Sequence, residues 1–294
     1  MLARRIGREH ARRLAQARTL DDALAELSAS AYGRFVHPGM SLARAQRGIA
    51  ETTLWHVRVL AGWSPPGAIE AIRALAAWFE LANVEDHLAY LAGGEAPAPF
   101  ALGGLATAWD RVAETRTPSE ARAALADSPW GDPGTDDLAD VLLALRLAWA
   151  RRLLDSLDEA SSWVPGAVAL VVARELLITG RSPDELRARR PPGIGTAWSQ
   201  AGSLRSLRDA LPAQASWALD GVEEPTDLWN AEVEWWRRVE EDAEAFAHAA
   251  LMGEPWVVGT VVLLGVDAWR AAGALASAAR GGTDDVLEVF DRIG

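Results

Sequence analysis

The residues of this chain best suited to chemistry are three aspartates, Asp136, Asp137 and Asp140, in the run DDLAD. Carboxylate oxygens are the ligands that Mg²⁺ prefers, and closely spaced carboxylates can hold the metal beside a diphosphate. The same aspartates follow GDPGT, which is typical of a turn, and precede a run rich in leucine and alanine. Acidic residues are favoured there because they cap a helix and complement its dipole. Helix initiation is the preferred interpretation, and a magnesium site is the alternative.

The magnesium alternative resembles class I terpenoid synthases, in which an aspartate-rich motif lies inside a helix behind apolar and aromatic residues. The helical character, length and tryptophan content of this chain suit such an enzyme. The second magnesium motif of that family is missing, because Asn230 is followed by Ala231, Glu234 and Arg238. A magnesium-dependent enzyme of the terpenoid-synthase type stays open as an alternative function.

The five histidines do not form a metal-binding motif. A di-iron bundle needs Glu-x-x-His on inward-facing helices, and no histidine here has a glutamate three residues before it. The sequence also lacks His-Glu-x-x-His, a Walker loop and Gly-x-Ser-x-Gly. We therefore predict no catalytic residue, no metal and no cofactor, and a protein that is not an enzyme.

The composition narrows the class of protein. Half of the 294 residues are hydrophobic, which is enough for a substantial core. The net charge is −12 and all 29 basic residues are arginine, a balance that argues against nucleic-acid binding. The absence of cysteine excludes disulfides and fits a cytoplasmic location. The most apolar stretch, 256–266, is about half of the ~20 residues that a membrane helix needs, so we expect no direct membrane insertion.

One stretch of sequence occurs twice. Residues 18–33 read RTLDDALAELSASAYG and residues 116–131 read RTPSEARAALADSPWG, aligned without a gap. A threonine with an acid three residues later predicts a helix start, and the final glycine predicts a helix end. The matching positions that are not alanine include Arg18 with Arg116, Thr19 with Thr117, Leu27 with Leu125, Ser30 with Ser128, Tyr32 with Trp130 and Gly33 with Gly131.

A fainter third copy begins at Ser203, and prolines recur at a similar period. Pro66, Pro165 and Pro255 stand 99 and 90 positions apart, whereas the three helix starts stand 98 and 86 positions apart. Two markers with one period indicate three repeated helical units, at 1–104, 105–190 and 191–294. The alternative is a helical chain whose proline turns recur by chance.

Helical periodicity dominates and strand-like alternation is absent, so the predicted fold class is all-α. The acidic run 232–244 is interpreted as a solvated helix face. The predicted helices are an N-terminal amphipathic one at 1–17 and longer ones at 42–61, 68–91, 138–157, 167–178, 228–251 and 257–280.

The order of these parts resembles the C/d subunit family of V/A-type ATPases. The likeness is carried by TLDDALAELSASAYGRFV, by FELANVEDHLAYLAG and by the final PWVVGTVVLLGVDAWR. Each repeat of that family has an acidic residue, then an asparagine, then a helix that leads to an arginine. Glu80 and Asn83 have this acid-x-x-Asn spacing, and the later helices keep charge without the asparagine, as Arg174 with Glu175 and as Asp267 with Arg270.

The resemblance implies a non-catalytic coupling subunit of a rotary V/A-type ATPase or ATP synthase. It implies three similar helical repeats arranged in a funnel with pseudo-threefold symmetry. The implied partners are the membrane rotor ring and the central-stalk subunits, which makes the protein cytoplasmic and peripherally attached to the membrane. A scaffold that keeps only this fold is a further alternative. The residues expected to shape the interface are Glu80, Asn83, Arg174, Asp267 and Arg270.

Overall fold

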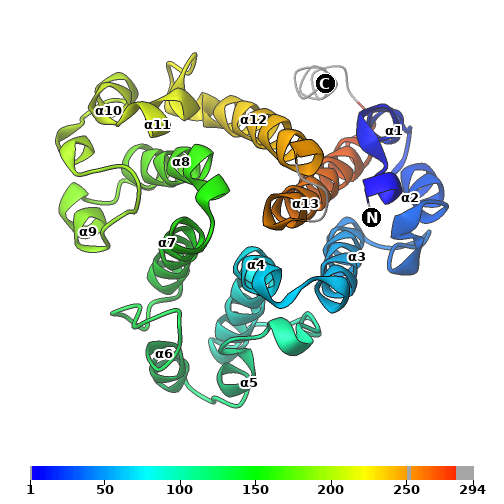
Figure 1. Cartoon of the computed structure of the whole chain (residues 1–294), viewed down its shortest axis with the longest axis horizontal. Coiled ribbons are helices and arrows are strands. Elements are labelled where there is room, and N and C mark those ends of the chain that lie inside the picture. Colours follow the sequence, from blue (N-terminus) through cyan, green and yellow to red (C-terminus); the bar gives the residue numbers. More distant parts are fainter. Residues whose placement is uncertain (1, 250–252, 283–294) are drawn as a thin grey trace. The chain divides into compact units, whose positions relative to one another are not determined.

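The computed structural model describes residues 2–249 and 253–282. In this part of the chain every regular element is a helix and no residue lies in a strand, so the all-α prediction is confirmed (Figure 1). The chain divides into two compact units. Unit 1 comprises residues 1–68 and 233–294, and unit 2 comprises residues 69–232. The boundaries predicted for three repeats, after residues 104 and 190, stay a prediction.

Unit 1 is formed by helices from both ends of the sequence. Its α-helices are α1 (Gly7–Ala15), α2 (Leu20–Ser28), α3 (Leu42–Trp63), most of α12 (Leu228–Ala249) and α13 (Glu254–Ala278). Helix α13 packs against α1, α2 and α3, as Figure 1 shows for α1 and α3. Leu14, Leu24, Leu27, Ile49 and Leu275 are among the residues of this core and are at most 2% exposed.

Unit 2 holds the remaining α-helices in sequence order. They are most of α4 (Pro66–Leu91), α5 (Trp109–Val112), α6 (Pro118–Ala126), α7 (Leu138–Ser156), α8 (Val164–Leu177), α9 (Pro183–Ala188), α10 (Leu204–Ala210) and α11 (Ala213–Ser216). One core joins α4 to α5, α6 and α7 through residues such as Leu81, Val84, Leu125 and Leu145. Helix α8 packs against α7, α10 and α11.

Short 3-10 helices connect the longer elements in both units. They are η1 (Leu2–Arg4), η2 (Ala31–Arg34), η3 (Gly103–Leu105), η4 (Asp158–Ser162), η5 (Ala197–Gln200), η6 (Trp217–Leu219) and η7 (Pro225–Asp227).

The predicted helix starts are confirmed by side-chain caps. Thr19 accepts a hydrogen bond from the amide of Asp22, and Thr117 accepts one from Glu120. Ser203 caps α10 in the same way. The predicted proline breaks are helix starts too, because Pro66 opens α4 and the first turns of α8 and α13 contain Pro165 and Pro255. Proline suits this position because its missing N–H would have no partner there.

The N-terminal helix predicted at 1–17 is wrong in its extent. Within residues 2–17 the chain forms η1, breaks, and begins α1 at Gly7, whose φ is +72°. Arg- and Ala-rich sequence favours one continuous helix, but the amides of Ile6 and Gly7 bind the carboxylate of Asp267 instead. A contact between distant segments thus overrides local propensity.

Helix α13 is long and apolar enough to cross a membrane by length and composition alone. However, 67% of its most apolar 18-residue window is buried inside the protein. It also approaches α12 closely, because a Cβ atom at Gly259 would lie 2.6 Å from the carbonyl oxygen of Ala243. These contacts are those of the central helix of a packed unit.

Candidate functional site

Four of the five predicted interface residues are buried. Glu80 and Asn83 lie on α4 in unit 2, and Asp267 and Arg270 lie on α13 in unit 1, each at most 2% exposed. Arg174 on α8 is exposed. The interface role of these residues stays a prediction. The four buried residues would contribute to an interface only indirectly, by holding their helices in place.

Glu80 is the centre of a dense hydrogen-bond cluster, the Glu80 cluster. Its Oε1 accepts from the backbone amides of Thr107, Ala108 and Trp109 at 2.8, 2.6 and 2.7 Å. Its Oε2 accepts from the indole Nε1 of Trp130 at 2.9 Å and from the hydroxyl of Thr107. A buried carboxylate is costly unless it is hydrogen-bonded, and here both oxygens are satisfied. The cluster therefore fastens α4 to the start of α5 and to the turn after α6.

Asn83, one turn along α4, holds a second segment. Its Nδ2 donates to the carbonyl of Phe100 at 3.0 Å, and its Oδ1 accepts from the amide of Phe100 at 2.7 Å. The rings of Phe79 and Phe100 meet edge to face with centroids 5.4 Å apart. The acid-x-x-Asn pair thus fixes the loop after α4 with one residue and the start of α5 with the other.

Asp267 forms a matching arrangement in unit 1, the Asp267 cluster. Its Oδ1 accepts from the amide of Gly7 at 2.9 Å. Its Oδ2 accepts from the amide of Ile6 at 3.1 Å and from the hydroxyl of Tyr32 at 2.9 Å. Burial, followed by the charge and hydrogen bond of Asp267, raises the pKa of Tyr32 well above its ordinary value. Tyr32 therefore stays a neutral donor to a buried carboxylate.

The two clusters follow one plan. In each, a carboxylate on a long helix accepts amide N–H groups from the start of a shorter helix and a polar hydrogen from an aromatic ring. The rings are Tyr32 and Trp130, the matched aromatic positions of the repeated sequence. Ser30 and Ser128, two residues earlier, also make the same pair of hydrogen bonds, accepting from the aromatic residue's amide and donating to the carbonyl of Leu27 or Leu125. The sequence repeat therefore has a structural counterpart in its first two copies.

The proposed third copy differs. Trp217 donates its indole N–H at 2.9 Å to the carbonyl of Gln214, three residues before it in the chain. On α8, Glu175 accepts from Arg181 Nε at 2.8 Å, and Arg181 also contacts Asp140 at 2.5 Å. The charged pair Arg174 and Glu175 therefore does not reproduce the role of Glu80 or Asp267.

Arg270 belongs to a separate ionic group, the Glu240 cluster. Its Nη1 donates to Glu240 Oε1 at 2.6 Å, and its Nη2 donates to Oε2. Arg8 Nη2 donates to Oε2 at 2.7 Å, and Arg5 Nη1 lies 3.9 Å from Oε1. Burial raises the pKa of Glu240, but the hydrogen bonds and charges of Arg270 and Arg8 outweigh burial and bring the pKa below its ordinary value. The carboxylate is therefore ionised at neutral pH.

Glu240 corrects the interpretation of 232–244 as a solvated face, because its residue is 2% exposed. The position of Glu240 in the helical repeat predicts that it is buried, although the number of charged residues in 232–244 suggests a solvated face. Glu240 stands seven residues after Val233 and three before Ala243, and both of these are buried. Positions at this spacing share a helix face, which places Glu240 on the apolar stripe of α12.

The DDLAD aspartates take part in helix initiation and ion pairs. Asp137 caps α7 and accepts from the amide of Asp140 at 3.1 Å, which confirms the preferred interpretation. Asp140 contacts Arg181 and lies 3.0 Å from Arg189. Asp136 lies 3.5 Å from Arg122. Among the described residues, no group of three histidines or acidic residues is placed to hold a metal ion.

His56 on α3 is the most buried histidine of the described residues. It is 4% exposed, and its Nε2 has no hydrogen-bond partner in this part of the chain. Burial, followed by the positive charge of Arg4, lowers the pKa of His56. The folded state therefore favours neutral His56.

We predict that acidification destabilises the protein through His56. The pKa of a histidine is about 6.5 in an unfolded chain, so below that pH the unfolded state binds this proton more readily than the folded state. The free energy of unfolding should fall as pH drops from about 6.5 toward the lowered pKa. Urea unfolding at pH 5, 6 and 7 measures this slope, which should be smaller in His56→Leu. Parallel slopes for the two proteins would contradict the assignment to His56.

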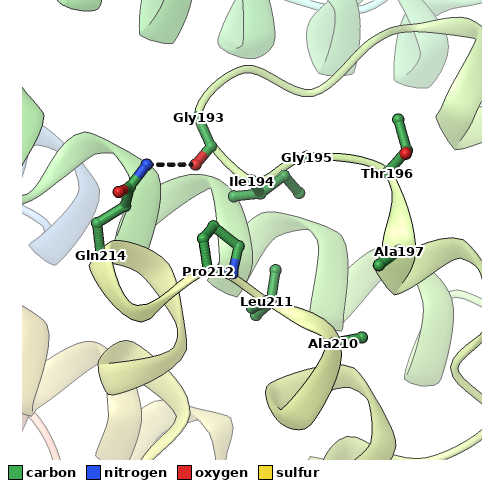
Figure 2. Close-up of a pocket in the computed structure, with 9 residues that line it drawn as sticks. All are labelled: Gly193, Ile194, Gly195, Thr196, Ala197, Ala210, Leu211, Pro212 and Gln214. Atoms are coloured by element: carbon green, nitrogen blue, oxygen red, sulfur yellow. Dashed lines mark hydrogen bonds between the residues drawn. The ribbon is translucent and has the colours of Figure 1, made fainter.

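A hollow in unit 2 lies between the loop at Gly193 and the segment that begins at Ala210, as Figure 2 shows. Its volume is about 620 Å³. Gln214 Nε2 donates to the carbonyl of Gly193 at 3.4 Å across one side. Its described lining consists of glycine, small and apolar residues, with Thr196 and Gln214 as polar side chains, and contains no charged group. The described lining of this hollow therefore provides no group for acid–base catalysis or for ionic binding of a ligand.

No protein-family model and no curated protein matches this sequence. The functional interpretation therefore depends on the clusters themselves and on the sequence resemblance.

Proposed function

We propose that this protein is a non-catalytic coupling subunit of a rotary V/A-type ATPase or ATP synthase, which docks the central shaft onto the membrane rotor ring. The observation that supports this proposal best is the repeated carboxylate cluster, centred on Glu80 in one unit and on Asp267 in the other. The stretches that resemble the C/d subunit family supply both carboxylates and one of the two aromatic donors, Tyr32. In this proposal three helical repeats form a funnel with pseudo-threefold symmetry.

The physical reason for this proposal is that the clusters stiffen the helices. A part that transmits torque must keep its shape under load, and a helix fastened at several points along its length resists bending. Glu80 and Asn83 fasten α4 to three segments by hydrogen bonds, several of them to the carboxylate of Glu80. Charge-assisted hydrogen bonds of this kind are about twice as strong as neutral ones. The clusters are thus suited to rigid docking, on the cytoplasmic face of the membrane and without insertion into it.

Arg174 allows a direct test, because it is the predicted interface residue whose side chain is exposed. The protein is co-expressed with rotor-ring and central-stalk subunits of a rotary ATPase from the same host, and the complex is recovered through a tag on the stalk. We expect the wild type to copurify and Arg174→Glu to be recovered at least about tenfold less well, since reversing a charge at an interface costs more than about 1.4 kcal/mol.

Arg205→Glu is the matched control, because Arg205 is also an exposed arginine of unit 2 and lies on α10. It should copurify like the wild type, and both variants should keep the wild-type melting temperature. Failure of the wild type to copurify with these rotary-ATPase subunits would leave the free-standing scaffold as the better account. Equal losses in the two variants would remove Arg174 from the interface.

The terpenoid-synthase alternative makes an opposite prediction. Each DDLAD aspartate is already engaged by an arginine or by a helix amide, so binding magnesium would require these contacts to break. We expect no product from prenyl diphosphates with Mg²⁺, measured by gas chromatography of the extracted reaction. Turnover that is abolished by Asp136→Ala would favour the enzyme instead.

A further inference from the structure

A second hollow lies within unit 1 and is unlike the rest of this acidic protein. It has a volume of about 420 Å³ and is bounded by the segment from η1 to α1 and by the turn after α2. Arg4, Arg5, His10 and Ser30 are its polar lining residues, and its described lining contains no acidic side chain. The chain as a whole carries a net charge of −12. We call this feature the N-terminal hollow.

The two arginines of the N-terminal hollow keep unused hydrogen-bonding capacity. Arg4 is exposed and has no ion-pair partner among the described residues. Arg5 Nη1 lies 3.9 Å from Glu240, which is already bound by Arg270, and the buried Nε of Arg5 has no hydrogen-bond partner in this part of the chain. A buried donor without a partner is costly, so an acceptor that reaches it is favoured.

Two carboxylates contact residues of this lining, and each also has partners outside it. Asp267 accepts from two backbone amides and a tyrosine hydroxyl, and Glu26 lies 3.1 Å from His10 Nε2 and also pairs with Arg13. Arg4 in turn acts on His56, whose pKa it helps to lower. Within the described part of the chain, the guanidinium of Arg4 thus stays open to an added anion.

We propose that the N-terminal hollow binds a phosphate-type oxyanion through Arg4 and Arg5. Guanidinium groups match the oxygen geometry of phosphate with paired N–H donors. The hollow is large enough for a phosphate group together with part of the molecule that carries it, so the group belongs either to a small soluble phosphate or to a lipid headgroup. This inference is independent of the proposed coupling function.

The test measures phosphate binding to the full chain by isothermal titration calorimetry, against sodium chloride at equal ionic strength. We expect saturable binding at one site, weakened about tenfold by Arg4→Ala and further by Arg4→Ala/Arg5→Gln. Arg58→Ala is the matched control, because Arg58 is an exposed arginine of unit 1 on α3, away from the hollow. It should bind like the wild type, and circular dichroism melting checks that each variant is folded.

A second arm separates the two sources of the oxyanion. Flotation with vesicles of phosphatidic acid in phosphatidylcholine should retain the wild type, and the Arg4 variant should be lost, if the group comes from a lipid. Binding to free phosphate alone assigns the site to a soluble ligand, and either pattern supports the proposal. Absence of saturable binding in both arms, or an equal loss in Arg58→Ala, would overturn it.

Discussion

Replacing Glu80 with leucine is expected to lower the free energy of unfolding by about 3–5 kcal/mol. The substitution removes the acceptor of three backbone amides and of the Trp130 indole N–H, all close to a residue that is 1% exposed. Water does not reach these donors easily, so they would lose their hydrogen bonds without replacement. For a unit of this size the loss corresponds to a fall in melting temperature of roughly 10 °C.

Thermal unfolding followed by circular dichroism measures the effect, with Glu70→Leu as the control on the same helix. Glu70 pairs with Arg73 at the surface, and exposed ion pairs contribute less than about 1 kcal/mol. Trp130→Phe should cost less in the Glu80→Leu background than in the wild type, because the indole N–H has then already lost its acceptor. Additive losses for Glu80 and Trp130 would contradict the hydrogen-bonded cluster.

Local features of the fold were predictable from the sequence because their causes lie within a few residues. A capping side chain and the amide that it accepts from are three positions apart, as for Thr19, Ser41 and Thr117. The long helices were found within a few residues of their true ends for the same reason: α4 was predicted at 68–91 and spans Pro66–Leu91. The predicted end of α12 at residue 251 lies outside the described residues.

Long-range partners were beyond the reach of sequence patterns. Asp267 meets amides 260 and 261 positions away, and nothing near Gly7 indicates that its amide needs a distant acceptor. The same limit applies to the units, because residues 1–68 join 233–294 across the whole of unit 2. A repeat detected in the sequence indicates similar segments, but it does not specify which segments pack together.

The candidate residues illustrate the difference between residue type and environment. Arg174 and Arg270 occupy comparable places in the sequence pattern, yet Arg174 is exposed and Arg270 is 2% exposed. What separates them is Glu240, which accepts two hydrogen bonds from Arg270. The many charged residues of α12 suggested that Glu240 is solvated. Its spacing from Val233 and Ala243 would have predicted that it is buried.

Breaking that pair gives the second large effect that we expect. Arg270→Leu should lower the free energy of unfolding by about 3–5 kcal/mol, because it leaves Glu240 buried with fewer compensating charges. Arg8 and Arg5 remain near the carboxylate, but their side chains are 42% and 23% exposed and hold it less completely. Urea unfolding at pH 7 measures the loss.

A double-mutant cycle separates the pair from simple loss of packing. Glu240→Leu/Arg270→Leu should be more stable than either single variant, because it leaves no unpaired charge in the core. The exposed pair Arg237 and Glu241 on the same helix is the matched control, and its coupling should stay below about 1 kcal/mol.

The pH dependence of stability provides an independent check on the role of Glu240. Because the pKa of Glu240 is lowered in the folded state from 4.5, its contribution is present above that pH and lost as pH falls below it. The acid-induced loss between pH 5 and 3 should therefore be smaller in the double variant, and a loss as steep as that of the wild type would show that other carboxylates cause it.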